Sequence, residues 1–306
     1  MRQKGMALLT VLLLLAVMVA LAALATERWF FSFQYGVQLH QRAQGKWFAA
    51  GAEDVAGGLL RLDALDDMRH THLSQRWATL ANSLPLESGQ LQMRINDAQA
   101  CFNLNALGDD GARTVFIRLL TLNGVETATA QMIAVAAADW VTEGDESRAG
   151  GVKDSEYAAL EPPYLTAQQL MWDVSELRQV RGVSADLWNQ LRTQLCALPV
   201  QSLALNINTL GAEHWPLVAA LSDDITEEDV RRWIAQRPDA GWPTLEAAFA
   251  GLKPLAGQRR YLALNSEFFS VHISASMDDV AYRQHSLLQR SNGKISVLWR
   301  QQEAEP

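Results

Sequence analysis

The sequence predicts an α+β fold, in which a long N-terminal helix is followed by strands, a large, mainly helical insert and further strands. Three observations predict it. Residues 6–25 form an apolar run without a charge, and helical spacing continues to about residue 65 without proline. Residues 90–96 and the last 40 residues or so alternate with the two-residue period of strands. Residues 111–260, between them, have mainly helical patterns.

The apolar run also predicts one membrane span. Met6–Ala25 is 20 residues long, and a helix of that length covers roughly 30 Å, the thickness of a bilayer core. Arg2 and Lys4 precede the run. The excess of basic residues on cytoplasmic flanks therefore places residues 1–5 in the cytoplasm and everything after about residue 27 on the far side of the membrane.

Three interpretations of this N-terminus compete. A cleavable signal peptide would use the small residues Ala23-Leu24-Ala25, but the apolar run exceeds the usual length and the helical pattern continues past it. A plain signal anchor leaves Lys4-Gly5-Met6 unexplained. A prepilin-type leader accounts both for Lys4-Gly5-Met6 and for the long helical pattern, because a short basic leader ends in Gly5 and Met6 becomes the first residue of a retained helix.

Two cysteines, Cys101 and Cys196, lie in the region placed outside the cytoplasm. Two thiols in an oxidising compartment usually pair, so we expect a disulfide between them. Two separate buried thiols are the alternative.

Individual elements follow from the same patterns. Besides 90–96, strands are expected at 268–275, 281–289 and 295–301, with a short strand and turn within 100–107. Turns are expected at Met277-Asp278-Asp279 and at Ser291-Asn292-Gly293, because Asn-Gly favours a tight hairpin. Residues near 95 should lie beside residues near 285. Helices are expected at 111–123, 126–141, 166–171, 174–180, 184–196, 211–222, 226–236 and 244–251. At the start of the helix 226–236, Thr226 with Asp229 is close to a capping box, whereas Ser175 in the helix 174–180 has no such partner.

Several stretches, taken in order, resemble one known family. They are KGMALLTVLLLLAVM at the N-terminus, KWFAAGAEDVA at 46–56, INDAQACFNLNAL at 95–107, KDSEYAAL at 153–160, DVSELRQVRGVSADLWNQL at 173–191, LCALPV at 195–200 and LNINTL at 205–210. Together they resemble the protein K family of the type II (general) secretion pathway, whose members are large minor pseudopilins. The resemblance covers nearly the whole chain.

The resemblance implies a pilin-like fold, with a long N-terminal helix on an antiparallel sheet and a large, mainly helical domain inserted between strands. The chain would then have five parts. These are a prepilin leader (1–5), the transmembrane half of the N-terminal helix (6–26), the first part of a pilin-like domain (27–108), an inserted helical domain (109–262) and the C-terminal strands of the pilin-like domain (263–306).

The resemblance also implies a function and partners. The chain would be a single-pass inner-membrane protein with a periplasmic head. It would cap the periplasmic pseudopilus and initiate its assembly with minor pseudopilins I and J, for export of folded proteins across the outer membrane. Prepilin peptidase would cleave after Gly5 and methylate Met6. The major pseudopilin and inner-membrane secretion components are further expected partners.

Thr10 fits this resemblance. Most pilin-like proteins carry Glu at mature position five, where it neutralises the N-terminus of a neighbouring subunit. That position is Thr10 here, and the family characteristically lacks the acid. A subunit at the end of a filament can lose it, because an unpaired charge in the membrane is costly. A simpler alternative is a threonine that bonds back to a helix carbonyl.

An acid-rich loop from Asp139 to Tyr157 is the best candidate for metal chemistry. Oxygen ligands on a glycine-containing loop suit Ca²⁺, and the resemblance implies calcium binding here. The pattern departs from the family at Thr142, Gly144 and Lys153. A solvated acidic loop is the alternative. The expected ligands are Asp154, Glu156, Glu143 and Asp145.

Other functions lack support. Residues 111–256 contain 11 Lys and Arg against 19 Asp and Glu, so DNA binding by the helix-hairpin-helix-like stretches is disfavoured. His70 and His72 are two residues apart, which does not suit joint zinc binding on a helix. The sequence has no Gly-x-Ser-x-Gly, Walker, Cys-x-x-Cys or His-Glu-x-x-His motif, so we expect a protein that is not an enzyme. The alternative function is a monomeric, membrane-anchored periplasmic binding module with calcium or an exoprotein as ligand.

Overall fold

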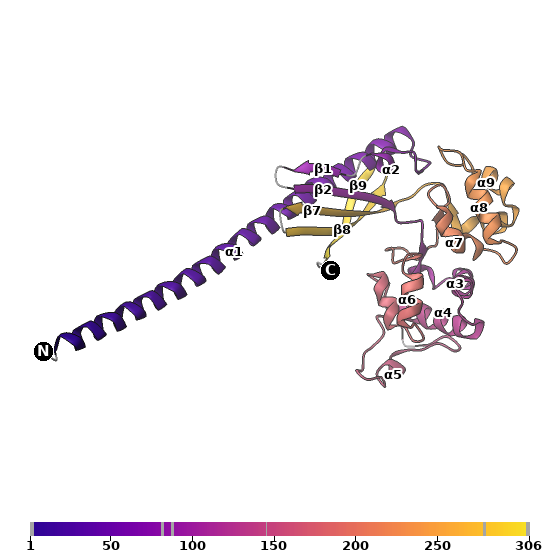
Figure 1. Cartoon of the computed structure of the whole chain (residues 1–306). Coiled ribbons are helices and arrows are strands. Elements are labelled where there is room, and N and C mark those ends of the chain that lie inside the picture. The colour runs from indigo at the N-terminus through magenta and orange to yellow at the C-terminus, as the bar shows by residue number, and fades with distance from the viewer. Residues whose placement is uncertain (1–2, 81–82, 87–88, 145, 278–279, 304–306) are drawn as a thin grey trace.

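The computed structural model describes residues 3–80, 83–86, 89–144, 146–277 and 280–303. A long helix projects its N-terminal half from a globular head (Figure 1). In the head, the C-terminal part of this helix packs on a five-stranded sheet, and a helical lobe lies beyond the sheet, at the end away from the projecting N-terminus. The predicted fold class is confirmed.

Helix α1 (Gln3–Asp66) is continuous over 64 residues. Residues 6–40 are exposed throughout. Farther along, small and aliphatic side chains at helical spacing are buried: Ala49, Ala52, Ala56, Leu60 and Ala64. At Gly45 the helix approaches the sheet closely, because a Cβ atom there would lie 2.5 Å from Cβ of Tyr282.

The sheet has the order β1-β2-β7-β8-β9, with all neighbours antiparallel. Its strands are β1 (Ser83–Leu86), β2 (Gly89–Asp97), β7 (Phe268–Met277), β8 (Val280–Ser291) and β9 (Lys294–Glu303). The four predicted strands correspond to β2 and β7–β9, and β1 was not predicted. Asn292 and Gly293 have positive φ angles of 51° and 73°, as the predicted hairpin requires. The other predicted turn includes residues 278–279, which lie outside the described residues.

Residues near 95 were predicted to lie beside residues near 285, and this prediction was wrong by one strand. Ile95 lies opposite Val271 on β7, and β8 is one strand farther away, with His285 opposite His272. The chain re-enters the sheet beside the strand that it left, and the amide of Ala98 donates to the carbonyl of Phe268 at the junction with the lobe.

The insert between β2 and β7 forms the helical lobe. Two parallel pairs of two-residue strands, β3 with β4 and β5 with β6, join its parts. Helix α2 (Arg76–Thr79) lies outside the lobe, after α1. The lobe contains β3 (Phe102–Asn103), η1 (Leu104–Ala106), α3 (Asp110–Leu122), α4 (Thr127–Val141), α5 (Asp154–Tyr157), η2 (Val174–Gln179), α6 (Ala185–Leu191), β4 (Leu195–Cys196), β5 (Leu205–Asn206), η3 (Ala212–His214), α7 (Trp215–Ala219), α8 (Glu227–Ala235), α9 (Leu245–Gly251), η4 (Lys253–Tyr261) and β6 (Leu262–Ala263), where η denotes a 3₁₀ helix.

Four predicted helices of the lobe are confirmed as α3, α4, α8 and α9. The capping box at the start of α8 is also confirmed, with Thr226 and Asp229 each bonding the backbone of the other. The short strand predicted within 100–107 is β3. At 174–180 the helix is of the 3₁₀ type, and its capping box is formed by Asp173 and Glu176.

Three predicted helices of the lobe differ from those in the structure. Residues 166–171 are not helical, because Thr166 and Gln168 instead donate to the carboxylate of Asp154. The helix predicted at 184–196 ends at Leu191, so that β4 can pair with β3. The helix predicted at 211–222 divides into η3 and α7, with Pro216 in the first turn of α7.

The two parts of the head have separate hydrophobic cores. One lies between α1 and the sheet, where Trp77 meets Phe269 edge-on at 5.7 Å. The other fills the lobe, where Trp233 stacks on Trp242 at 4.4 Å. A small third cluster at the junction contains Leu198, Phe268 and Leu287. The lobe is therefore stabilised by its own core.

Candidate functional site

The exposed half of α1 presents a long apolar surface. By length and composition it is the one helix among the described residues that could cross a membrane. The apolar character continues past the predicted span into an exposed aromatic group of Trp29, Phe30, Phe31 and Phe33. Monomeric soluble proteins seldom expose such a contiguous apolar surface. The surface therefore requires a lipid or protein environment.

The residues predicted for processing and assembly all lie in this helix. Gly5 and Met6 belong to its first turns, and the Met6 side chain is 71% exposed. The Thr10 hydroxyl donates to the carbonyl of Ala7 at 2.9 Å. The hydroxyl is thus satisfied within the helix itself, and its position places no charge in the span.

An ion pair joins α1 to the last strand. Glu53, whose side chain is 2% exposed, accepts from Nε of Arg300 at 3.0 Å and from its Nη2 at 2.6 Å. The amide of Gln284 on β8 also donates to Glu53. The hydrogen bonds to Glu53 raise the pKa of Arg300. This contact fixes the sheet on the helix and hence the direction in which the projecting half points.

A polar network at the end of β2 joins the sheet to the lobe. The Asp97 carboxylate accepts from the amide of Gln99, from Asn206 Nδ2, and from the hydroxyls of Thr209 and Ser266, all at 2.5–2.8 Å. Burial raises the pKa of Asp97, and the four donors act in the opposite direction. The donors come from the lobe and from the segment before β7, so a single carboxylate ties the junction together.

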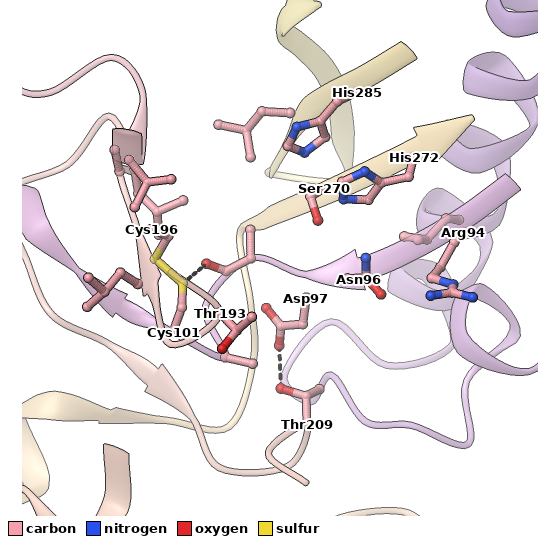
Figure 2. Close-up of a pocket in the computed structure, with 18 of the residues that line it drawn as sticks. Arg94, Asn96, Asp97, Cys101, Thr193, Cys196, Thr209, Ser270, His272 and His285 are labelled. Atoms are coloured by element: carbon pink, nitrogen blue, oxygen red, sulfur yellow. Dashed lines mark hydrogen bonds between the residues drawn. A yellow bond between two sulfur atoms is a disulfide. The ribbon is translucent and has the colours of Figure 1, made fainter. Parts of the chain in front are cut away.

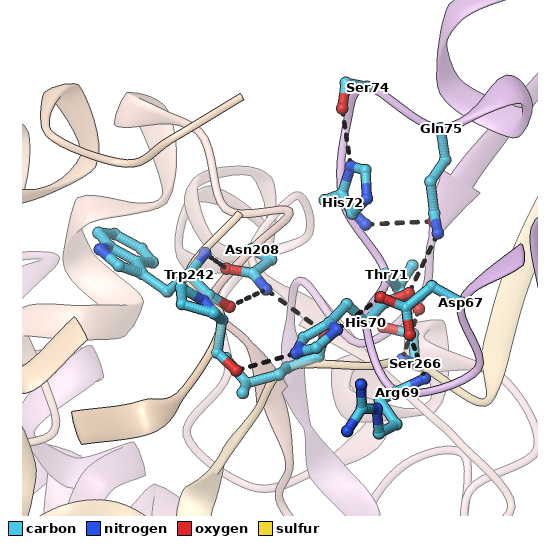
Figure 3. Close-up of polar contacts among 12 residues, drawn as sticks. Asp67, Arg69, His70, Thr71, His72, Ser74, Gln75, Asn208, Trp242 and Ser266 are labelled. Carbon is cyan, nitrogen blue, oxygen red and sulfur yellow. Dashed lines mark hydrogen bonds and ion pairs between the residues drawn. The ribbon is translucent and has the colours of Figure 1, made fainter. Parts of the chain in front are cut away.

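The loop after α1 reinforces the same junction (Figure 3). His70 lies between the Asp67 carboxylate at 2.7 Å and the carbonyl of Pro243 at 3.0 Å, whereas His72 contacts the Ser74 hydroxyl. The two imidazoles therefore have different partners. The Thr71 amide donates to Leu264, which links the end of α1 to the chain that leaves the lobe.

The predicted disulfide between Cys101 and Cys196 is present. It joins the loop after β2 to β4 of the lobe, with the two Cα atoms 5.9 Å apart. The disulfide borders a cavity of about 710 Å³ between the lobe and the sheet (Figure 2). It is thus a covalent part of the lobe junction.

Among the described residues, the predicted calcium ligands do not form a cluster. Asp145 lies outside the described residues, and Glu143 is exposed. Asp154 accepts from Thr166 and from Gln168, and hydrogen bonds from Thr166 are the largest cause that lowers its pKa. Glu156 forms an ion pair with Arg181.

Cationic side chains of the protein bind the oxygens of this loop. Nζ of the buried Lys153 donates to the carbonyls of Asp139 and Thr142 at 2.9 and 2.8 Å. The fully buried carboxylate of Asp139 pairs with Arg148 at 2.7 Å. In this arrangement the described residues do not form the shell of six to eight oxygens that Ca²⁺ takes. Calcium binding stays a prediction, and Lys153 is the residue that a bound ion would have to displace.

Comparisons with known proteins give the family. Models described as "Type II secretion system (T2SS), protein K" match residues 100–200 and 205–272. The type II secretion system protein K of Pectobacterium carotovorum subsp. carotovorum is 39% identical over 316 residues, covering 98% of this chain and 96% of the relative. The protein of the same description from Klebsiella pneumoniae is 39% identical over 314 residues, with the same coverage. The chain belongs to the type II secretion system protein K family.

A solved structure supports this assignment. The fold is similar to that of a chain in the crystal structure of the GspK-GspI-GspJ complex from the type 2 secretion system of enterotoxigenic Escherichia coli. The TM-score is 0.79 at 30% sequence identity, and the match covers 87% of this chain and 98% of that chain. The resemblance seen in the sequence is thereby confirmed, and the chain is a minor pseudopilin of type II secretion.

For this member of the protein K family, sequence reasoning missed the roles of the junction asparagines. Asn105 donates to the carbonyls of Met171 and Leu198, and Asn206 joins the Asp97 network. Both are nearly or fully buried. The signal was present in the family stretches INDAQACFNLNAL and LNINTL, because asparagines between apolar residues in a buried segment must find hydrogen-bond partners inside the protein.

Proposed function

We propose that this chain caps the tip of the periplasmic pseudopilus and initiates its assembly with minor pseudopilins I and J, for export of folded proteins across the outer membrane. The role is mechanical and does not involve catalysis. The crystal structure of the Escherichia coli complex supports this choice of partners, because in it GspK is in complex with GspI and GspJ.

One observation carries the proposal: the apolar half of α1 has no protein cover, and the large lobe lies at the opposite end of the molecule (Figure 1). In a fibre built from parallel α1 helices, neighbouring helices would cover the apolar half. A further subunit stacked beyond the head would meet the lobe. The shape therefore favours a terminal position.

The same helix supports a membrane-bound stage before assembly. We propose that residues 1–5 face the cytoplasm, that the following apolar residues span the inner membrane and that the head lies in the periplasm. Prepilin peptidase would remove the leader after Gly5 and methylate Met6. Intact-mass and N-terminal analysis of the membrane form would then find methylated Met6, whereas signal peptidase cleavage predicts Thr26 and a plain anchor predicts residue 1.

Co-purification tests the assembly role. The detergent-solubilised full chain is expected to purify with pseudopilins I and J when the three are co-expressed. The variant Phe33→Asp places a charge on the exposed half of α1, beyond the span. It should lower recovery of the partners by about tenfold, the equivalent of roughly 1.4 kcal/mol.

Trp172→Asp is the matched control, because Trp172 is also an exposed aromatic residue but lies on the lobe. It should leave recovery unchanged. A chain that stays monomeric at high concentration with both partners present would contradict the proposal. That result would favour the membrane-anchored binding module.

A further inference from the structure

A cluster of possible metal ligands lies on the face of the sheet turned away from α1. On β7, Val271 and Ile273 belong to the core against α1, so the intervening His272 faces the other way. On β9, Arg300 reaches Glu53 of α1, which places Glu303 on the opposite face. His272 and His285 also line the cavity between the lobe and the sheet, and none of the three residues lies on the exposed half of α1.

The register of three strands brings the cluster together. His272 on β7 lies directly opposite His285 on β8, and their rings stack with centroids 4.1 Å apart. Glu303 at the end of β9 places Oε1 3.6 Å from Nδ1 of His272. One ligand atom from each of the three side chains lies within 4.8 Å of the others. Among the described residues, this is the one group of its kind.

One donor atom of the cluster has no partner. Nε2 of His285 is buried and has no hydrogen bond among the described residues. The ring is held between His272 and the edge of Trp299, whose centroid lies at 4.8 Å. A buried polar atom that is left unsatisfied is unfavourable, and a bound ion would satisfy it.

We propose that His272, His285 and Glu303 bind a divalent transition metal ion, with Zn²⁺ as the ion best matched to two imidazoles and one carboxylate. This donor set is typical of zinc sites that keep a fourth position for water or another ligand. Tetrahedral binding at about 2.0–2.2 Å requires the three donors to move closer together. The side chains of His272 and Glu303, 43% and 44% exposed, are free to rotate toward His285.

Charged groups of both signs surround the cluster. Burial, followed by the neighbouring His272, lowers the pKa of His285 to about 4. Glu303 and Asp173 contribute negative charge near His285. Arg94 and Arg283 border the hollow beside Glu303 and oppose a cation.

The bound ion would cross-link three strands at the rim of the cavity. Figure 2 shows His272 and His285 on neighbouring strands beside the cavity, with the disulfide on its other side. Glu303 is the last described residue of β9. The metal would therefore hold the C-terminal end of the sheet, and this inference does not depend on the proposed place of the chain in the pseudopilus.

Metal titration of the full chain in detergent tests the proposal. The protein is first stripped with a chelator, and Zn²⁺ alone is added while binding is followed by calorimetry. Co²⁺ serves as a spectroscopic probe of tetrahedral coordination. We expect one saturable site per chain. His272→Gln, His285→Gln and Glu303→Gln should each weaken Zn²⁺ binding at least tenfold. Substitution of residues that only hydrogen-bond to metal ligands already lowers metal affinity by about 10–100-fold.

His40→Gln is the matched control, since His40 is an exposed imidazole on α1. It should bind Zn²⁺ like the original chain. Near-UV circular dichroism of the metal-free variants checks folding, and the exposed Glu303→Gln variant keeps the test valid if a histidine variant unfolds. The proposal is overturned by the absence of a saturable site, or by ligand variants that bind as tightly as the His40 control.

Discussion

Glu53 and Arg300, 247 residues apart in sequence, form a bidentate ion pair that joins the last strand to the N-terminal helix. The pair is asymmetric. The glutamate side chain is 2% exposed and the arginine side chain is 57% exposed. The two halves of the contact should therefore respond differently to substitution, because only the loss of the arginine leaves a buried charge unpaired.

Arg300→Ala should destabilise the head more than Glu53→Gln. Breaking a buried pair by removing one partner costs about 3–5 kcal/mol, and water access at Arg300 reduces that figure here. Glu53→Gln should cost about 1–2 kcal/mol, since the freed arginine can turn into solvent. Thermal unfolding of the full chain, followed by near-UV circular dichroism, measures both. Lys294→Ala, an exposed change on the same strand, is the control. Equal effects of the two substitutions would refute the argument.

Gly45→Ala should lower stability by about 1–3 kcal/mol, because the new methyl group would lie 2.5 Å from Cβ of Tyr282 and force the helix off the sheet. Gly36→Ala is the matched change in the same helix, with nothing within 4 Å of its added Cβ. It should be neutral or stabilising by about 0.5–1 kcal/mol, the usual helix preference of alanine over glycine. Denaturant midpoints of the two variants decide between close packing and helix propensity, and a similar shift for both would contradict close packing at Gly45.

Calcium binding in the 139–157 loop should be limited by Lys153. Its ammonium group holds the carbonyls of Asp139 and Thr142 that an ion would need. Lys153→Glu removes the competing cation and adds a carboxylate, so Ca²⁺ should bind at least tenfold more tightly, equivalent to about 1.4 kcal/mol. Calorimetry with Ca²⁺ measures the change, with Arg181→Lys as a control that keeps the charge at Glu156. An original chain that binds Ca²⁺ as tightly as the variant would show that Lys153 does not compete.

Stability should fall in acid partly through His214. Its Nδ1 accepts from the amide of Gly211 at 2.8 Å, which requires an unprotonated nitrogen. Burial lowers the pKa of His214, and the nearby Arg237 acts in the same direction, whereas Glu213 and Asp97 oppose it. Because the folded-state pKa lies below the unfolded value of about 6.5, this contribution is present above pH 6.5 and is lost as the pH falls through the folded pKa.

His214→Gln should therefore flatten the acid side of the stability profile, measured as the free energy of unfolding between pH 7 and pH 4. His40→Gln, a change at an exposed histidine on α1, should leave the profile as it was. An unchanged slope in the His214 variant would mean that other groups account for the acid sensitivity.

Long elements with one buried face were predictable from the sequence. Helix α1 and strands β2, β7, β8 and β9 carry strong periodicity, and each was predicted within a few residues. The register was not predictable, because β7 and β8 have the same alternating pattern and nothing in it says which one lies beside β2. Predictions for the lobe were wrong where side-chain hydrogen bonds override local helix preference, as at Thr166 and Gln168, which bond to Asp154.

The candidate sites show the same division. The apolar surface of α1 and the pairing of Cys101 with Cys196 follow from composition and compartment. The histidine and glutamate cluster could not be foreseen, since its members are separated by 13 or more residues and meet only through strand register. The substitution of Lys153 for an expected acid was visible in the sequence, but its two carbonyl partners were not.

The unbroken course of α1 has a mechanical consequence. At about 1.5 Å per residue, 64 residues give a rod of roughly 96 Å. With no proline hinge along its length, the rod does not shorten or fold under load. A push applied near its N-terminal end would therefore be transmitted along the helix to the head, which would advance by the same distance as that end.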